Sequence, residues 1–281
     1  MLVVVQKRII FGGSAGLLWY SYGAAAYLME KWGDELTEDV SFEGVSGGCS
    51  AAWSMAIHSQ LKTVSITEFA GVGIDGFVSR NQKEGWMGLW CFKAAWAIAD
   101  KFWTMSEAAL NKLKETSSRF KAGDTITSIL EGKVVFWHTD AYTFKLFPCA
   151  NLTDRNYTAD AYLASCWVPG ILGPALAVAT EHLAGKAVAL DGGVGLAAGD
   201  RSMFEPTHKD GKEIRTIFFE VYPTVPAPPK SDNLRVIKLW QWDDFRWYGV
   251  HQGLCNPKQA TELYLRGYYT AQAHRQEVEE I

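Results

Sequence analysis

A serine flanked by glycines is the first group in this sequence that could carry chemistry. Gly44-Val45-Ser46-Gly47-Gly48 matches the pattern G-x-S-x-G and stands between a β-prone segment and a helical one. In this pattern a nucleophilic serine occupies a sharp turn, and the two outer glycines let strand and helix pass close together. The helix that follows aims its N-terminal amides at the point where an oxyanion would develop. An ordinary glycine turn with a capping serine is the alternative interpretation.

A hydrolytic serine needs a proton acceptor, and Asp191-Gly192-Gly193 is the sharpest candidate. The motif ends the apolar run Ala187–Leu190, so the Asp191 carboxylate is expected at the tip of a buried strand. Asp-Gly is also a common hairpin turn, and that is the alternative interpretation here.

A glycine-rich stretch follows the first apolar run of the chain. Successive backbone amides at a helix N-terminus bind anions, so Gly12-Gly13-Ser14-Ala15-Gly16 suits a phosphate or an oxyanion. The stretch is not G-x-G-x-x-G and lacks the lysine of a P-loop, which argues against nucleotide binding. A tight turn between strand and helix is the simpler interpretation.

The elements that must position these motifs alternate between strand and helix. We expect strands at Arg8–Phe11, Val40–Glu43, Lys133–Trp137, Thr143–Ala150, Ala187–Leu190, Arg215–Tyr222 and Leu234–Leu239. We expect helices at Leu17–Lys31, Cys49–Leu61 and Gln259–Glu280, with a mainly helical, lid-like insert over residues 62–130. The early strand–helix repeats predict an α/β fold with a mostly parallel central sheet flanked by helices. Residues 223–233 form a proline-rich loop within a single domain of residues 1–281.

Taken together, the three motifs resemble the patatin-like phospholipase family. That family joins a glycine-rich oxyanion loop, a G-x-S-x-G turn and a later Asp-Gly-Gly in this order. The run 164–170, Ala-Ser-Cys-Trp-Val-Pro-Gly, is similar to the family's helix end with a Pro-Gly turn, and Leu265-Arg266-Gly267-Tyr268 is similar to its closing helix. The glycine loop departs from the pattern, because Phe11 replaces the first of three glycines and Ala15 replaces a basic residue.

The resemblance implies a three-layer patatin-like fold and a two-residue mechanism. Ser46 would attack an ester carbonyl, and Asp191 would take its proton without a histidine. The amides of Gly12, Gly13 and Gly47 would hold the oxyanion. The implied function is that of a lipid acyl hydrolase, which cleaves carboxylic ester bonds of glycerolipids as a phospholipase A, lysophospholipase or acylglycerol lipase. It needs a lipid substrate and no cofactor.

Tryptophans cluster between residues 86 and 103, where the chain is apolar almost all round a helix. One interpretation is a largely buried helix. The other is a lid or interfacial helix in which Trp86, Trp90 and Trp96 meet substrate or a lipid surface. Residues 80–124 hold eight Lys/Arg and five Asp/Glu, a net +3, which favours transient contact with a membrane or lipid droplet.

Composition and charge exclude several other classes. The net charge of −4 argues against nucleic-acid binding. The five cysteines form no C-x-x-C pair and the six histidines show no metal-ligand spacing, so we expect neither a disulfide framework nor a metal site. No signal peptide or membrane-spanning run is recognised, so a cytoplasmic protein with peripheral membrane contact is expected.

Two other functions remain open. An α/β-hydrolase would use Ser46, Asp191 and His251 in that chain order, although only one strand–helix unit precedes Ser46. A non-catalytic lipid-binding protein would keep the pocket without activity, and the departure at Ala15 leaves room for this alternative. Cys49 is expected to be a small buried residue, and Asp154 is a competing acid more typical of a loop.

Overall fold

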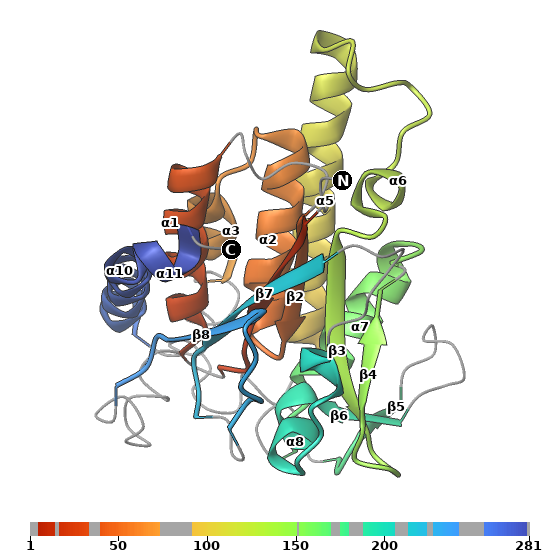
Figure 1. The fold of residues 1–281 in the computed structure, drawn as a ribbon. Coiled ribbons are helices and arrows are strands. Elements are labelled where there is room, and N and C mark those ends of the chain that lie inside the picture. Colours follow the sequence, from red (N-terminus) through yellow and green to blue (C-terminus); the bar gives the residue numbers. More distant parts are fainter. Residues whose placement is uncertain are drawn as a thin grey trace.

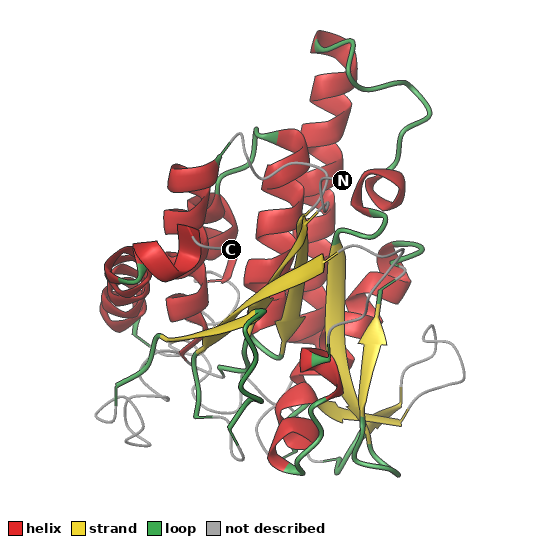
Figure 2. Ribbon diagram, in the orientation of Figure 1, coloured by secondary structure: helices red, strands yellow, loops and turns green. Residues whose placement is uncertain are grey.

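The computed structural model describes residues 5–14, 17–33, 40–73, 92–150, 152–169, 175–179, 188–205, 213–223, 227–241 and 256–279. These residues form an α/β structure in which helices cover both faces of one twisted sheet (Figure 1, Figure 2). The predicted class, a mostly parallel central sheet flanked by helices, is confirmed.

The sheet has eight strands in the order β5-β6-β3-β2-β1-β7-β8, with β4 paired to β3 outside this path. Neighbours among β1, β2, β3, β7 and β8 run parallel, whereas β4 and β6 run antiparallel to β3. The strands are β1 Val5–Phe11, β2 Val40–Val45, β3 Val134–Asp140, β4 Leu146–Cys149, β5 Val178–Ala179, β6 Val188–Asp191, β7 Glu213–Glu220 and β8 Leu234–Lys238.

Two hydrophobic cores lie on opposite faces of the sheet because successive side chains of a strand point to opposite sides. Ile9 and Phe11 of β1 belong to the larger core, and Ile10 belongs to the smaller one. The larger core lies under α1 (Leu18–Trp32), α2 (Gly48–Leu61), α3 (Ile66–Gly73), α5 (Phe92–Thr116) and α7 (Arg155–Cys166). The smaller core lies under α8 (Gly192–Ala197) and the 3₁₀ turn η4 (Ser202–Phe204).

A buried ion pair joins the strands on the smaller face. Arg8 donates to both carboxylate oxygens of Glu43, from Nε at 2.7 Å and from Nη2 at 2.8 Å. The indole Nε1 of Trp137 also donates to Glu43, at 2.8 Å, and Arg8 donates to the Met203 carbonyl oxygen at 2.9 Å. These bonds satisfy both charges and tie β1, β2 and β3 to η4.

The last helices pack against the first one. Helix α10 (Pro257–Ala273) crosses α1 where a glycine of each helix faces the other's backbone. A Cβ on Gly23 would overlap the Tyr264 backbone, and a Cβ on Gly267 would overlap the Tyr20 backbone. The absence of a side chain at these two glycines therefore permits the close crossing that sets α10 beside α1 (Figure 1).

Several predicted boundaries are wrong. The predicted strand at Thr143–Ala150 begins only at Leu146, because Asp140 and the four residues after it form a turn. The predicted C-terminal helix is divided at His274 into α10 and α11 (Arg275–Glu279). Strand β3 runs to Asp140, three residues beyond the predicted Trp137.

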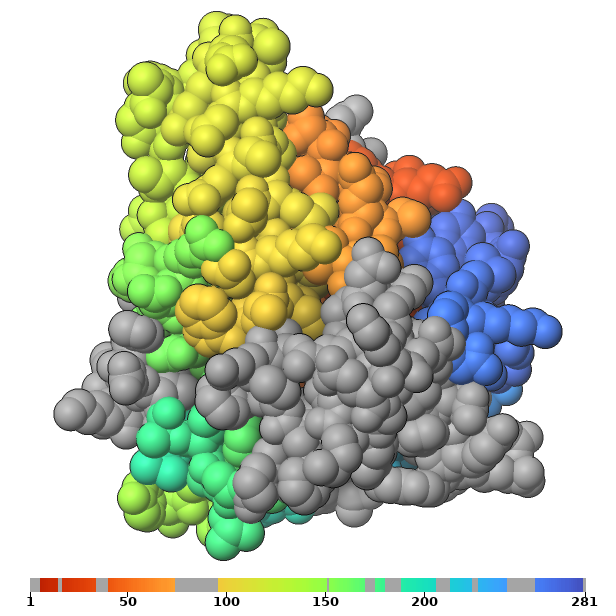
Figure 3. All heavy atoms as spheres, turned by 180° about the vertical axis from the view of Figure 1, so that it is seen from behind, coloured from red at the N-terminus to blue at the C-terminus, as the bar shows by residue number. Residues whose placement is uncertain are grey.

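The helical character of residues 62–130 is confirmed where the chain is described. Helices α3, α5 and α6 (Ile126–Leu130) lie there, and Figure 3 shows α5 exposed along one side of the molecule with α7 beside it. The other side of α5 joins the larger core, where Trp103 stacks on Trp53 with ring centroids 5.9 Å apart. The described part of α5 therefore belongs to the hydrophobic core, and a lid-like role of the insert stays a prediction. Residues 74–91, with Trp86 and Trp90, lie outside the described residues.

Among the described helices, none combines the length and the apolar character needed to cross a membrane.

Candidate active site

Ser46 occupies a sharp turn between β2 and α2. Its φ of 55° lies in the left-handed region, which a residue with a side chain adopts at a cost of about 1–3 kcal/mol. The side chain is buried, and α2 begins two residues later with its N-terminal amides directed at the turn. Such strain at a potential nucleophile is typical of a functional turn.

The glycines around Ser46 have the steric role that the motif predicts. A Cβ on Gly44 would overlap the backbone of Cys49, and a Cβ on Gly48 would overlap the Phe11 carbonyl group at the end of β1. Strand and helix therefore approach so closely that only glycine fits on either side of the turn.

Strand register brings Asp191 next to Ser46. In β3, Trp137 pairs with Val45 of β2, and the following residue, His138, pairs with Asp191 of β6. Strand β4 pairs with both Trp137 and His138, so it fills one edge of β3, and β2 and β6 must share the other edge. Strands β2 and β6 therefore end head to head. A Cβ on Gly192 would lie 2.5 Å from the Trp137 carbonyl oxygen, which reflects how closely they meet.

Asp191 ends β6 and caps α8. Its carboxylate Oδ1 accepts the Gly193 N–H at 2.7 Å, while its own backbone N–H donates to the Trp167 carbonyl oxygen at 2.8 Å. Its carbonyl oxygen accepts the Thr139 hydroxyl at 2.8 Å. The residue is only 5% exposed, so the alternative interpretation as a hairpin turn is wrong.

Burial raises the pKa of Asp191 to about 6, against the opposing effect of hydrogen bonding from the Ser46 side chain and the Gly193 amide. Carboxylate Oδ2 is buried and accepts no hydrogen bond within 3.5 Å. The opposing effect of Ser46 on this pKa indicates that its hydroxyl lies close to the Asp191 carboxylate. Catalytic hydrogen bonds are often long before substrate binds.

Ser165 is a residue of the site whose contacts the sequence did not predict. Its Oγ accepts the backbone N–H of Ser46 at 2.9 Å and donates to the Trp137 carbonyl oxygen at 2.5 Å. The Cys49 thiol donates to the same Oγ at 3.1 Å. Ser165 is completely buried at the end of α7 and therefore fixes the turn that carries Ser46. The family-like run 164–170 contained this residue but gave it no role.

The glycine loop lies beside the turn, but one of its amides is already in use. Gly12 donates its N–H to the Phe219 carbonyl oxygen at 2.9 Å, which continues the pairing of β1 with β7. Gly12 as an oxyanion donor is therefore wrong in this structure. A Cβ on Gly13 would lie 3.6 Å from the Ser46 Cβ, and among the described residues the amides of Gly13 and Gly47 donate no hydrogen bond.

Other sequence candidates lie elsewhere or have structural roles. Burial raises the pKa of the Cys49 thiol, which keeps it neutral. Asp154 caps α7 by accepting the Tyr157 N–H at 2.9 Å. Trp96 is half-buried and packs against the larger core. His251 and Ala15 lie outside the described residues, and within the described part of the chain no group of His, Cys, Asp or Glu could hold a metal ion.

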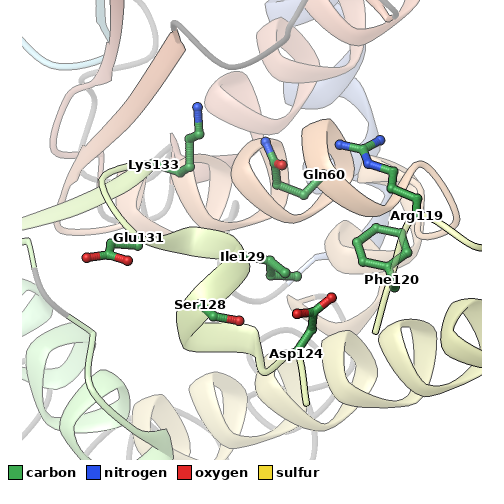
Figure 4. A pocket seen from close by; sticks show the side chains of 8 residues that line it. All are labelled: Gln60, Arg119, Phe120, Asp124, Ser128, Ile129, Glu131 and Lys133. Atoms are coloured by element: carbon green, nitrogen blue, oxygen red, sulfur yellow. The ribbon is translucent and has the colours of Figure 1, made fainter. Parts of the chain in front are cut away.

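A hollow of about 440 Å³ lies at the other end of α2 (Figure 4). Its lining combines charges of both signs with polar and apolar side chains and comprises Gln60, Arg119, Phe120, Asp124, Ser128, Ile129, Glu131 and Lys133. Gln60 is near the C-terminus of α2, whereas Ser46 precedes its N-terminus, and a 14-residue helix spans roughly 20 Å. The hollow is therefore separate from the serine turn.

No family model matches this sequence, and no sequence of a curated protein matches it. Solved structures with a similar course of the chain include ExoU, a type III effector protein also seen in complex with SpcU from the type III secretion system of Pseudomonas aeruginosa, and VipD from Legionella pneumophila. For ExoU the TM-score is 0.46 at 15% identity over 97% of this chain, and for ExoU in its complex it is 0.44 at 12% over 97%. For VipD it is 0.43 at 13% over 95%.

This chain spans about half of the ExoU chains, 53% and 51%, and 66% of the VipD chain. At these TM-scores and identities the similarity assigns neither a family nor an activity.

Proposed function

We propose that the protein is a lipid acyl hydrolase that cleaves carboxylic esters through Ser46 and Asp191. The observation that carries this proposal is the head-to-head meeting of β2 and β6, which sets a strained serine beside a buried carboxylate. The order of the motifs, which resembles that of patatin-like phospholipases, supports a glycerolipid as the substrate.

The proposed reaction begins with attack of Ser46 Oγ on the ester carbonyl carbon. Asp191 takes the hydroxyl proton, and the N–H groups of Gly13 and Gly47 stabilise the negative charge that develops on the carbonyl oxygen. Removing one such donor typically costs about 3 kcal/mol of transition-state stabilisation. Asp191 then returns the proton to the departing alkoxide, which leaves as an alcohol, and an acyl group remains on Ser46.

Water completes the proposed cycle. Asp191 accepts a proton from water as the hydroxide attacks the acyl-enzyme, and Ser46 leaves with that proton restored. Membrane or lipid-droplet contact by Trp86 and Trp90 stays a prediction, since both lie outside the described residues.

The test is hydrolysis of a short soluble ester and of phosphatidylcholine by the wild type, Ser46→Ala and His251→Ala. We expect Ser46→Ala to abolish turnover of both esters and His251→Ala to retain most of it. A loss at His251 as deep as that at Ser46 would favour the α/β-hydrolase triad. A wild type that binds lipid but hydrolyses neither ester would favour the non-catalytic lipid-binding protein.

A further inference from the structure

The hairpin that joins β3 to β4 presents aromatic side chains to solvent. Tyr142 is 79% exposed, Phe144 is 49% exposed, and Phe147 on β4 is 47% exposed. Figure 3 shows this end of the hairpin projecting at the lower end of the molecule. We call residues 141–145 the hairpin tip. Large apolar side chains that gather at one projecting point mark an interaction surface more often than scattered ones do.

The backbone of the hairpin tip is fixed by Asp140 rather than by its aromatic rings. Asp140 Oδ1 accepts the N–H of Thr143 at 2.7 Å, the hydroxyl of Thr143 at 2.8 Å and the N–H of Tyr142 at 3.1 Å. The Asp140 N–H donates to the Lys145 carbonyl oxygen at 2.9 Å. The turn can therefore form without the aromatic side chains of Tyr142 and Phe144.

Phe144 adopts a backbone conformation that disfavours it. Its φ of 55° is left-handed, where glycine and asparagine fit well and a bulky aromatic residue does not. The exposed half of its side chain does not offset the free-energy cost of this backbone conformation by packing inside this chain. An apolar residue held in strain at a solvent-exposed point indicates a role outside the folded chain.

The hairpin tip lies at the same end of the sheet as the candidate active site. His138, which pairs with Asp191, precedes Ala141 by three residues of the same strand and turn, a span of roughly 10 Å. Figure 1 shows the hairpin extending past the end of β3 beside β6. A surface that touched the tip would therefore face the end of the sheet where Ser46 lies.

The charge of the hairpin indicates which kind of partner its tip suits. Residues 140–149 contain one acidic residue, Asp140, and one basic residue, Lys145, so their net charge is zero. The tip offers apolar and aromatic area without a basic cluster. Tyrosine suits the boundary between lipid and water, and phenylalanine suits the apolar region just beneath it.

We propose that Tyr142 and Phe144 insert into the surface of a lipid aggregate and hold the candidate active site against its substrate. This proposal rests on the proposed function, because a lipid ester must be drawn from an interface. Since insertion is apolar, the affinity should depend little on salt.

Vesicle binding by the Ser46→Ala protein tests the proposal without consuming the lipid. The probe is phosphatidylcholine vesicles, measured by co-sedimentation at about 0.05 M and about 0.5 M salt. We expect Tyr142→Ser with Phe144→Gly to lower the partition coefficient by about tenfold or more. Glycine relieves the left-handed strain, so the melting temperature should stay the same or rise by about 2–4 °C.

The matched control is Tyr269→Ser, since Tyr269 is 60% exposed on α10. The control should bind vesicles as the parent does. Equal binding by parent and tip variant, or no binding by the parent, overturns the proposal. Turnover of a short soluble ester, measured in proteins that keep Ser46, separates this proposal from the proposed function. The tip variant should retain that turnover. A wild type that lacks it contradicts the proposed function instead.

Discussion

At the scale of single residues, one carboxylate oxygen of Asp191 accepts a hydrogen bond and the other accepts none. Oδ1 is held by the Gly193 amide, so the carboxylate cannot turn freely. Oδ2 is buried with no hydrogen-bond partner, on a residue whose pKa is raised to about 6. A buried base with a spare lone pair and a pKa raised to about 6 is suited to accept a proton from Ser46.

The first prediction at this scale concerns the pH profile. Because Asp191 must be charged to act as a base, kcat/KM for a soluble ester should rise with pH through about 6 and then level off. Below that value it should fall about tenfold per pH unit. A profile centred near pH 7 that disappears in His251→Ala would instead assign the base to histidine.

A second prediction concerns stability and follows from the same pKa. A folded-state pKa of about 6, raised above the ordinary 3.8, means that Asp191 stabilises the fold when protonated. That contribution is complete below pH 3.8 and is lost as the pH rises through 6. Asp191→Asn stays neutral, so its free energy of unfolding should match the wild type near pH 4 and exceed it by up to about 3 kcal/mol at pH 7. Urea unfolding of both proteins across this pH range checks the prediction. A difference in their free energies of unfolding that does not change with pH would contradict it.

At the scale of elements, Ser165 connects three of them. One hydroxyl at the end of α7 bonds the serine turn after β2, the carbonyl group of Trp137 in β3, and Cys49 in the first turn of α2. All donors and acceptors of that hydroxyl are in use. The nucleophile's backbone is thus positioned by a residue more than a hundred positions away in the chain.

Ser165→Ala should therefore destabilise the fold and impair the site together. It leaves the Ser46 amide and the Trp137 carbonyl oxygen buried without this partner, at about 1–3 kcal/mol each. We expect kcat for a soluble ester to fall more than KM changes, because the turn loosens. The control is Ser59→Ala, since buried Ser59 donates only to Ala56 within α2. Equal behaviour of the two variants would contradict a positioning role for Ser165.

At the scale of the whole molecule, the crossing of α1 and α10 joins two helices that lie far apart in the sequence. Gly23 and Gly267 allow that crossing because each faces the backbone of the other helix. Gly267→Ala should lower the free energy of unfolding by about 1–3 kcal/mol or more through overpacking. Gly71→Ala in α3 meets nothing within 4 Å and should raise it by about 0.5–1 kcal/mol. Thermal unfolding of both variants checks this, and a neutral Gly267→Ala would contradict the close crossing.

Much of this arrangement could be predicted from local sequence. The G-x-S-x-G spacing predicted the serine turn, and the apolar run before Asp191 predicted a buried strand tip. Those features depend on residues close together in the chain. The use of the Gly12 amide by Phe219 and the contacts of Ser165 depend on strand pairing between distant segments, which periodicity does not report. The turn at residues 141–145 was also missed, because Phe144 stands where glycine would have marked it.

The central claim is that Ser46 is a nucleophile whose proton passes to Asp191. The most direct test is covalent labelling with a fluorophosphonate, in which serine oxygen bonds to phosphorus as fluoride leaves, followed by mass spectrometry of the labelled peptide. We expect the label on Ser46, no such label in Ser46→Ala, and a labelling rate lowered about a hundredfold or more in Asp191→Asn. A label on another residue, or wild-type labelling of Asp191→Asn, would contradict the account.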